Sequence, residues 1–400
     1  MAGPFIPKAL VAALCLTLGA FASPFDKIQD AATKLANIQH QALENAYKVL
    51  DNSLSDSMSR VSTCNRDTVA VRKEFGDLTK AERKAYTNAV KCLLESPSKL
   101  PTGQYPGAKS RYDDFVNMTP SIHSTANFLH WHRYYVWAYE TALRNECQYA
   151  GYQPYWDWSK YSDLVHSPIF NGDEWSMGSN GDAIGPHGGM NMGPGSPSLP
   201  GGPGGGCVTS GPFANLTIHL GPVMPTMDPA LKIPSNPRAD GYGDNPRCLR
   251  RDVSNFLPER YLRPDDLLRH IESSNDIATF QDTLQMNMSN PLAALHSAGH
   301  YSVWGDPGGD VYVSPGEPFF WLHHTQLDRH WWMWTMYIES QLKTRTSMYE
   351  GGTNWMLPDS PRGSPDDKQE MGVAAPESMN HLASRDLFST TGGPLCYVYA

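Results

Sequence analysis

The pattern of apolar and polar positions predicts long helices in the first half of the chain. Residues 25–58 have a helical composition with no proline or glycine, and they predict one or two helices. Thr79 and Glu82 fit the capping-box pattern, so we expect a helix to begin there and to run through Cys92. Residues 127–149 form an aromatic run without proline or glycine, which is typical of a buried helix.

The second half of the chain adds a glycine-rich segment and two more predicted helices. Of the 35 residues from Gly172 to Gly206, 13 are glycine, and no strand–loop–helix context with Lys-Ser or Lys-Thr accompanies them. We therefore interpret this segment as a solvated surface loop. Helices are expected at 290–303 and 320–343. With no internal repeat and no clear linker, the sequence predicts a mainly α fold, one domain with long loops and little β structure.

The N-terminus has the features of a secretory signal peptide. Lys8 precedes an apolar run over 9–18, and a small-x-small cleavage pattern ends at Ala22. The apolar run is too short to span a bilayer. We therefore expect residues 1–22 to be removed, leaving a secreted, extracellular domain over 23–400 with no membrane segment.

Cysteine usage agrees with export, and the charge excludes a nucleic-acid partner. The chain has 32 Lys and Arg against 41 Asp and Glu, a net charge of −9, without basic runs that could neutralise phosphates. Asn-x-Ser/Thr sequons stand at Asn117, Asn215 and Asn287. Removal of the signal takes away Cys15, and the other six cysteines predict up to three disulfides, with pairing left open, among Cys64, Cys92, Cys147, Cys207, Cys248 and Cys396.

Histidine spacing carries the candidate chemistry. His296 and His300 are four residues apart, which on a helix puts both imidazoles on one face, about 6 Å apart at Cβ, where they can bind one ion. His324 and Asp328 have the same spacing, so the carboxylate could orient a ligand imidazole by accepting its second N–H. A zinc protease would need Glu where Ser297 stands, which excludes that class.

A second group of histidines lies upstream. His123 and His132 are nine residues apart, so they converge only if His123 lies on the loop that enters the helix carrying His132. His130 is two residues from His132, and we do not expect both to reach one ion. An HxxxH pair alone is more often structural, but the twin His323-His324 in an aromatic helix is more specific. Imidazoles without nearby Cys or carboxylate ligands suit copper or zinc.

Several segments together resemble the tyrosinase and catechol oxidase family, and in particular its secreted fungal short forms. The similarity covers roughly residues 60–399. At the first copper site, CuA, it is carried by His123 and Phe128-Leu129-His130-Trp131-His132-Arg133. At the second, CuB, it is carried by His296-x3-His300 and Phe320-Trp321-Leu322-His323-His324-x3-Asp328-Arg329. Three further segments also resemble the family: Tyr155-Trp156-Asp157-Trp158, Gly205-Gly206-Cys207 and Tyr397-Val398-Tyr399.

The resemblance implies a four-helix bundle that holds two copper ions, each through three histidines. His323 matches the member of the twin that does not bind metal, and Asp328 and Arg329 match structural positions around the ligands. Ser297 stands where relatives that hydroxylate monophenols carry Asn. Five ligands are carried over by position: His123 and His132 at CuA, and His296, His300 and His324 at CuB.

The chain departs from the family pattern at two places. The first CuA histidine is expected shortly after a segment like Tyr112–Val116, but no histidine lies between Lys99 and His123. We therefore expect an incomplete CuA site with weaker copper binding. The second departure is milder, because Glu317-Pro318 stands where the family usually has Asp-Pro.

The implied function is a dicopper oxidase that uses O2 to convert small o-diphenols to o-quinones, with hydroxylation of monophenols left open. Ser297 and the lack of Asp or Glu over 285–294 favour o-diphenols. One alternative is a copper-binding relative whose activity is impaired or lost because the CuA histidine is missing. Another is an oxygen carrier like haemocyanin, which a short secreted chain disfavours. Because the chain stops at Ala400, just past Tyr399, we expect no C-terminal lid domain and no need for proteolytic activation.

Overall fold

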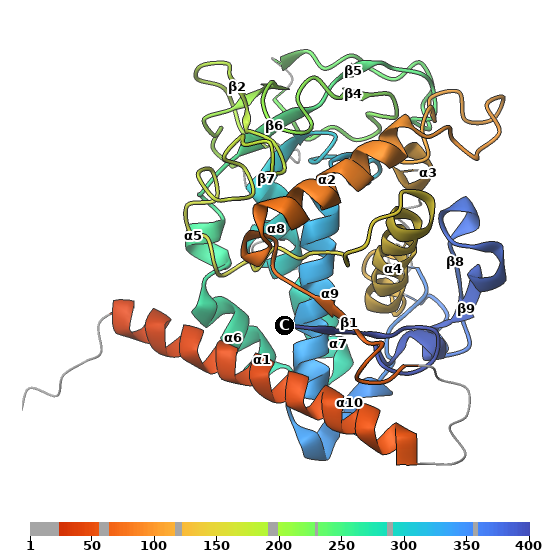
Figure 1. The fold of residues 1–400 in the computed structure, drawn as a ribbon. Helices are drawn as coiled ribbons and strands as arrows, with labels where there is room; N and C mark the ends of the chain where they lie inside the picture. The colour runs from red at the N-terminus through yellow and green to blue at the C-terminus, as the bar shows by residue number, and fades with distance from the viewer. Residues whose placement is uncertain are drawn as a thin grey trace, which may run out of the picture.

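Helix α9 (Phe320–Met336) runs through the middle of the fold and is contacted by the other histidine-bearing segments. Figure 1 shows it upright at the centre, with α4 (Phe128–Glu146) beside it and α1 (Pro24–Ser55) crossing its lower half. Helices α7 (Ile277–Gln285) and α8 (Leu295–Ser302) complete the bundle around the histidines. The computed structural model describes residues 24–55, 64–116, 122–190, 199–228, 231–285, 291–354 and 359–400.

The two aromatic helices predicted from sequence form the core of this bundle. Every side chain of α9 is buried, as are most of those of α4. The Trp321 indole stacks on the Tyr139 ring with centroids 3.7 Å apart and planes 2° apart, which joins α9 to α4. Large aromatic rings bury much apolar area at a small cost in side-chain entropy. The prediction of a mainly helical fold is confirmed.

Helix α9 ends earlier than the sequence predicted. The Asn45 amide of α1 donates to the Met336 carbonyl at 2.8 Å. The Arg345 guanidinium donates to the Trp334 carbonyl at 2.7 Å. These side chains satisfy carbonyls that the last turn of a helix leaves without partners, and the chain turns before continuing as α10 (Leu342–Thr346). One of these two side chains comes from α1, nearly 300 residues away, so its contribution is invisible in the local pattern.

The N-terminal helices agree with the sequence. Residues 24–55 form one continuous helix, α1, which packs on α9 and on α6 (Pro264–Ser273). Helix α2 (Lys80–Glu95) begins with the expected capping box, in which Thr79 Oγ1 accepts from the Glu82 amide at 3.2 Å and the Glu82 carboxylate accepts from the Thr79 amide at 2.8 Å.

Among the described residues, four further helices lie outside the predicted ranges, and a second predicted helix is shorter than expected. Helix α6 (Pro264–Ser273) has Pro at its first turn and Asp266 accepting from the Arg263 amide at 3.2 Å, a start signal present in the sequence. Helix α8 begins at Leu295, after a separate 3-10 turn over Pro291–Ala293. The remaining unpredicted helices are α3 (Asp113–Val116), α5 (Pro258–Tyr261) and α7.

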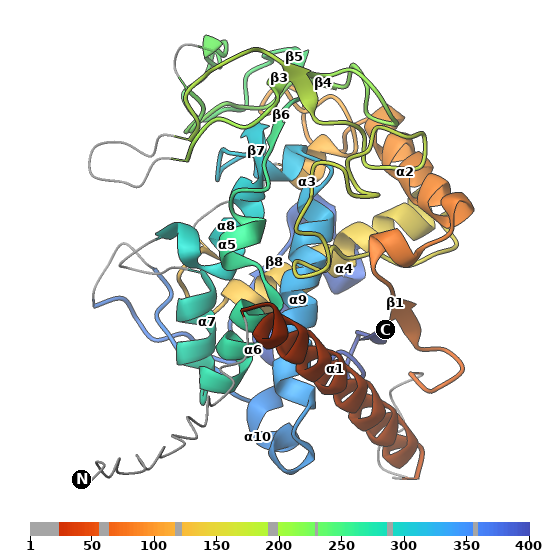
Figure 2. The same ribbon diagram turned by 90° about the vertical axis from the view of Figure 1, so that its left-hand side faces the viewer.

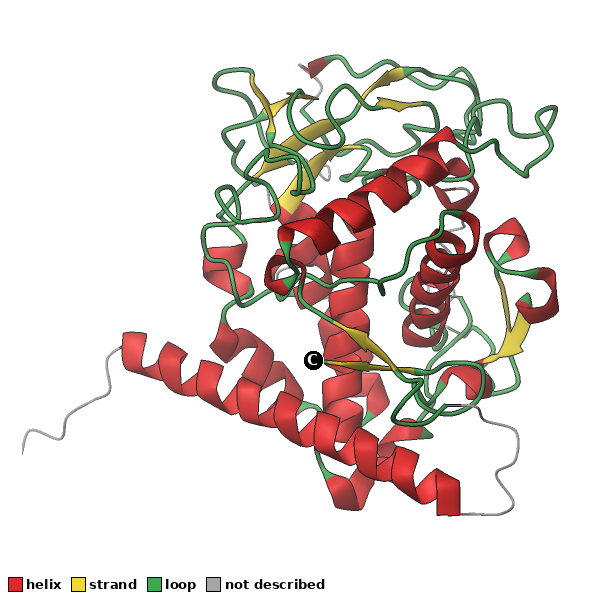
Figure 3. Cartoon of the chain, viewed as in Figure 1, coloured by secondary structure: helices red, strands yellow, loops and turns green. Residues whose placement is uncertain are grey.

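The strands are short and gather mainly at one end of the molecule, away from the bundle (Figure 3). A four-stranded antiparallel sheet has the order β2-β3-β6-β7, formed by Gly181–Ala183, Gly205–Val208, Arg250–Val253 and Val303–Asp306. The glycine-rich segment therefore contributes β2 and the start of β3, which its composition did not predict. Two further antiparallel pairs are β4-β5 (Thr217–Ile218, Arg247–Cys248) and β8-β9 (Lys368–Glu370, His381–Ala383).

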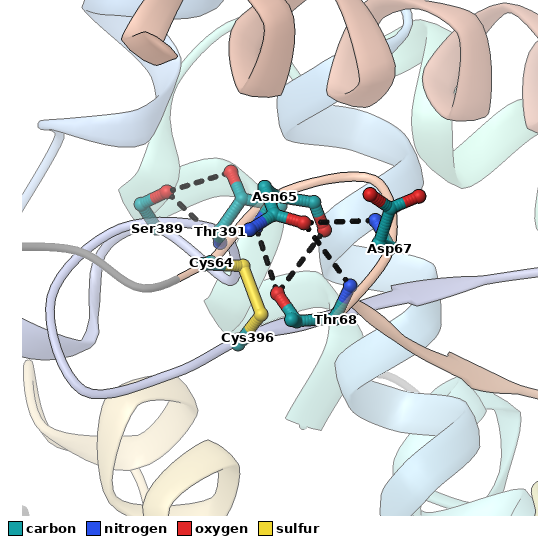
Figure 4. Close-up of a disulfide and its surroundings, with 7 residues drawn as sticks. All are labelled: Cys64, Asn65, Asp67, Thr68, Ser389, Thr391 and Cys396. Atoms are coloured by element: carbon teal, nitrogen blue, oxygen red, sulfur yellow. Dashed lines mark hydrogen bonds between the residues drawn. A yellow bond between two sulfur atoms is a disulfide. The ribbon is translucent and has the colours of Figure 1, made fainter.

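Three disulfides pair all six cysteines expected in the mature chain. Cys92 of α2 is joined to Cys147 at the end of α4, and Cys207 of β3 is joined to Cys248 of β5. Figure 4 shows the third disulfide, Cys64–Cys396. It lies beside a parallel pair of strands, β1 (Ala70–Arg72) and β10 (Tyr397–Tyr399), so two segments more than 300 residues apart are fixed side by side.

Some sequence predictions fall on residues that the structure leaves out. The signal segment 1–22 and the sequons at Asn117 and Asn287 lie outside the described residues. Asn215 is described, and it is exposed in a turn before β4. Among the helices described, none has the length and apolar character needed to traverse a bilayer. Figure 2 shows the C-terminus beside β1, the strand with which β10 pairs.

Candidate metal centre

Three imidazole nitrogens meet between α8 and α9. His296 and His300 lie one turn apart on α8, and their Nε2 atoms are 2.9 Å apart. The Nε2 atom of His324, on α9, is 3.0 Å from Nε2 of His300. The periodicity of α8 thus places both of its histidines on one face, as predicted, and α9 adds the third nitrogen from the opposite side.

Proton counting indicates that this cluster fits a metal ion. The Nε2 atom of His300 faces two other nitrogens, yet a neutral imidazole nitrogen carries either one proton or one lone pair. It cannot form two linear hydrogen bonds, so one of the two N···N contacts lacks a proper partner. A cation at the meeting point would use all three lone pairs. Imidazole nitrogen is a good ligand for copper and zinc.

Burial keeps these imidazoles in the neutral form that metal binding requires. Desolvation lowers the pKa of His296 and of His324 well below the usual value, and the neighbouring imidazoles lower it further. Burial lowers the pKa of His300 to about 3. Only a neutral imidazole offers a lone pair to a cation.

The upstream pair approaches the same place from α4. His123 lies in the turn before α4, as its spacing from His132 required. The His132 Nδ1–H donates to the Phe128 carbonyl at 2.8 Å, which leaves Nε2 with its lone pair. The centroids of the two imidazole rings are 5.5 Å apart.

The two histidine groups form one site. The His132 ring stacks on the His324 ring with centroids 4.5 Å apart, and the His123 and His296 rings are 5.7 Å apart. Histidines from segments nearly 200 residues apart therefore lie side by side. The hypothesis of a paired metal centre required this arrangement. The site thus brings the two upstream histidines against the downstream ones.

The histidines of α8 and α9, the downstream group, include a fourth imidazole. His296, His300, His323 and His324 each offer a nitrogen, and these nitrogens all lie within 4.8 Å of one another. The Trp158 indole N–H donates to His323 Nδ1 at 3.0 Å.

The spare histidine upstream is directed elsewhere. The His130 ring packs against Trp331, Tyr349 and Phe388, with centroids 4.8 to 5.2 Å away. It is fully buried, and burial lowers its pKa to about 3. His130 and His132 therefore point into different surroundings, in agreement with the expectation that both would not reach one ion.

The expectation that Asp328 orients the His324 imidazole is wrong. Helical side chains lean toward the N-terminus, and the His324 ring accordingly stacks on Phe320, one turn earlier, with centroids 4.0 Å apart. The Nδ1 atom of His324 has no hydrogen-bond partner among the described residues. The Asp328 carboxylate instead accepts from Arg133 Nε and from the Tyr397 hydroxyl, both at 2.6 Å.

Two other residues that the sequence placed around the ligands have structural contacts. Arg329 is 3.4 Å from the Asp157 carboxylate and lies over the Tyr155 ring, 4.6 Å from its centroid. The Ser297 hydroxyl donates to the Gln285 carbonyl at 3.0 Å, which ties α8 to the end of α7.

Sequence reasoning missed residues whose importance is purely spatial. Trp158 was noted only as part of a resembling segment, and nothing local connects it with His323. Gly299 was passed over, although a Cβ there would lie 2.1 Å from His323 Cε1. A glycine between two metal-face histidines was the available signal, because a helix interior disfavours glycine unless something needs the space.

Comparison with known proteins agrees with this site. A family model described as the common central domain of tyrosinase matches residues 101–337. The tyrosinase-like protein orsC of Emericella nidulans is 38% identical over 308 residues, which cover 74% of this chain and 80% of that protein. Tyrosinase P of Aspergillus terreus is 34% identical over 349 residues, which cover 83% of this chain and 92% of that protein.

A solved structure is similar over nearly the whole chain. It is a variant of polyphenol oxidase from Thermothelomyces thermophila, with 38% sequence identity and a TM-score of 0.83. The match covers 93% of this chain and 98% of that one. The family is one of type-3 copper proteins, which hold a pair of copper ions. Together with the histidine cluster, these matches establish that the chain belongs to the tyrosinase family and is a tyrosinase-type oxidoreductase.

Proposed function

We propose that the chain oxidises o-diphenols to o-quinones with O2. The observation that carries this proposal is the convergence of the His296, His300 and His324 Nε2 atoms within ring contact of His123 and His132. These five residues would hold copper. The reaction balances as two catechols and one O2 giving two quinones and two water molecules, and bound copper would supply the electron transfer between them.

The chain's own part in this reaction is to hold neutral ligands in a dry and rigid setting. His132 is fixed as a ligand by the Phe128 carbonyl, and Phe320 stacks on His324. The aromatic core excludes water around both helices. Fixed, desolvated ligands need little rearrangement when the metal changes its charge.

The polar groups around the site favour o-diphenols over monophenols as substrates. A monophenol must lose its proton to a base before it is hydroxylated. The nearby Glu317 carboxylate is engaged by Arg251 at 2.9 and 2.6 Å, and it also accepts from the Phe319 amide. Ser297 donates to a backbone carbonyl. Neither is available as a free base, which supports a diphenolase.

A second candidate follows from the ligand count at CuA. The sequence has no histidine between Lys99 and His123, so the upstream group has two imidazoles where the family uses three. On this alternative, the chain binds one copper ion tightly at His296, His300 and His324, and binds the second weakly. Its oxidase activity would then be impaired or lost.

Copper stoichiometry and turnover decide between the two candidates. The purified chain is loaded with copper and dialysed, copper per chain is measured by mass spectrometry, and O2 uptake is followed with 4-methylcatechol. Two coppers and steady uptake support the oxidase, whereas one copper without uptake supports the alternative. His296→Gln should lower uptake at least 100-fold. The matched control is His381→Gln, at an exposed position in β9, which should change nothing.

We also propose that the chain is exported and loses residues 1–22. Pairing of all six remaining cysteines supports an oxidising compartment. Expression with the native N-terminus in a fungal host tests this proposal. Secreted protein whose first residue is Ser23 agrees with it, and retention of Met1 in intracellular protein contradicts it.

A further inference from the structure

The downstream group contains one imidazole more than a three-histidine copper site uses. His323 offers a ligand nitrogen within 4.8 Å of those of His296, His300 and His324. Its ring centroid is 4.4 Å from that of His300 and 5.7 Å from that of His296. Distance alone therefore does not prevent His323 from binding the same ion.

The contact with Trp158 fixes which nitrogen of His323 carries the proton. An indole N–H only donates, so His323 Nδ1 must accept and must be unprotonated. A neutral imidazole has a single proton, which then stands on Nε2. The Nδ1 lone pair is occupied by Trp158 and Nε2 has no lone pair, so neither nitrogen is free to bind a metal ion.

Neighbouring residues hold this pair together. The Trp156 amide donates to the Leu322 carbonyl at 3.1 Å, which anchors the segment carrying Trp158 beside the first turn of α9. Trp158 is 1% exposed and His323 is fully buried, so water does not compete for the hydrogen bond. Among the described residues, no acceptor lies within hydrogen-bond distance of His323 Nε2, and the backbone of His296 lies near the ring. The hydrogen bond from Trp158 is therefore the contact that identifies the tautomer.

Gly299 allows this arrangement. A Cβ at this position would lie 2.1 Å from His323 Cε1 and 2.4 Å from Nδ1. Helix α8 can therefore pass directly over the His323 ring only with glycine here. The ring is thus held close to the ligands by packing, while its hydrogen bond keeps it from acting as one.

We propose that Trp158 is a positioning residue that reserves the metal ion for His296, His300 and His324 by holding His323 in its Nε2–H tautomer. This inference shares with the proposed function the requirement that a metal ion binds the cluster, and it does not require that the chain oxidises o-diphenols. Its consequence is that one coordination position stays open. A catalytic metal site requires such a position, whereas a fourth protein ligand would close it.

A spectroscopic experiment tests the proposal without relying on turnover. One equivalent of Co²⁺ is bound to the metal-free protein, and azide is titrated while the visible absorption of the cobalt is recorded. The wild type should bind azide at its open position. Trp158→Phe frees His323 to ligate, so azide affinity should fall at least 10-fold. The double variant W158F/H323N should recover the wild-type response, because the competing imidazole is gone.

Trp156→Phe is the matched control. The Trp156 ring lies 6.2 Å from His323 and is fully buried, but its indole N–H has no hydrogen-bond partner among the described residues. This variant should respond to azide like the wild type. An unchanged azide affinity in Trp158→Phe, or a loss that H323N does not reverse, overturns the proposal.

A second measurement applies even if Trp158→Phe does not fold or Co²⁺ does not bind. Nitrogen-15 NMR of metal-free protein labelled at histidine, with the His323 signal assigned through H323N, should give the Nε2–H tautomer. An Nδ1–H tautomer overturns the proposal. Failure of the chain to oxidise catechols would leave both readouts intact, so the proposed function and this inference fail separately.

Discussion

Replacing Asp328 by Asn should destabilise the protein strongly while leaving the metal ligands in place. Asp328 is 1% exposed, and its carboxylate accepts from Arg133 and from the hydroxyls of Tyr397 and Tyr399. Arg72 Nη1 is 3.6 Å away. Burial opposes ionisation, but the two guanidinium groups prevail and hold the pKa of the Asp328 carboxyl below its usual value.

The size of the effect follows from the charges left behind. Arg72 and Arg133 are buried at 0% and 1% exposure, and Glu140 and Asp328 balance them. Asn keeps the volume but removes one negative charge, and its NH2 group would replace an oxygen that now accepts from a guanidinium or from two tyrosine hydroxyls. Removing one partner of a buried ion pair costs about 3–5 kcal/mol. We therefore expect the free energy of unfolding of D328N to fall by about 4 kcal/mol.

Guanidinium unfolding followed by tryptophan fluorescence measures this loss, as a lower midpoint at an unchanged slope. The matched control is Asp366→Asn, which breaks the exposed pair with Arg385 and should cost less than about 1 kcal/mol. The network joins β10 to α9 and α4, so D328N should also loosen the C-terminal strand.

Zinc affinity of the folded variant distinguishes the two roles considered for Asp328. If Asp328 holds β10, α9 and α4 together, D328N should show a large loss of stability and a zinc affinity within a few-fold of wild type. If D328N instead loses less than about 1 kcal/mol of stability and 10- to 100-fold in zinc affinity, the carboxylate orients a ligand imidazole. Our assignment of Asp328 to the structural network would then be wrong.

Three further predictions concern stability. The double variant C64S/C396S removes a disulfide that joins residues at a sequence separation of 332. Its unfolding free energy, measured in denaturant, should fall by up to about 6 kcal/mol because the unfolded chain gains entropy. An unchanged unfolding free energy would contradict this prediction. Burial lowers the pKa of His270 to about 4, so the unfolded state binds the proton first. Stability should therefore fall between about pH 6.5 and 4, by up to about 3 kcal/mol for this group. Over the same pH range, H270Q should lose up to about 3 kcal/mol less stability than the wild type. Gly299→Ala should cost about 1–3 kcal/mol in a thermal melt because its Cβ meets an imidazole, whereas Gly103→Ala, with open space around it, should not.

Much of the bundle was predictable because helix formation depends on neighbours a few residues away. The capping box at Thr79 and the uninterrupted run before Glu146 are local signals, and both helices form as expected. Helix α6 carried a comparable signal at Pro264 that was not used. The end of α9 was not predictable, because Asn45 of α1 caps it from a distant part of the chain.

The candidate site also has features that the sequence predicts and features that it does not. Helical period alone places His296 and His300 on one face, and a helix entry before His132 is enough to direct His123 toward it. That His132 stacks on His324 depends on how α4 packs against α9, which no local pattern encodes.

The sequence by itself determined which residues can bind metal and where the main helices run, since periodicity, capping and residue chemistry act over one or two turns. Only the tertiary structure decided the disulfide pairing, the separation of Asp328 from its expected imidazole, and the bond from Trp158 to His323. These contacts join segments tens to hundreds of residues apart. Their formation depends on the packing of whole elements around one core, where burial leaves each polar group few partners to choose from.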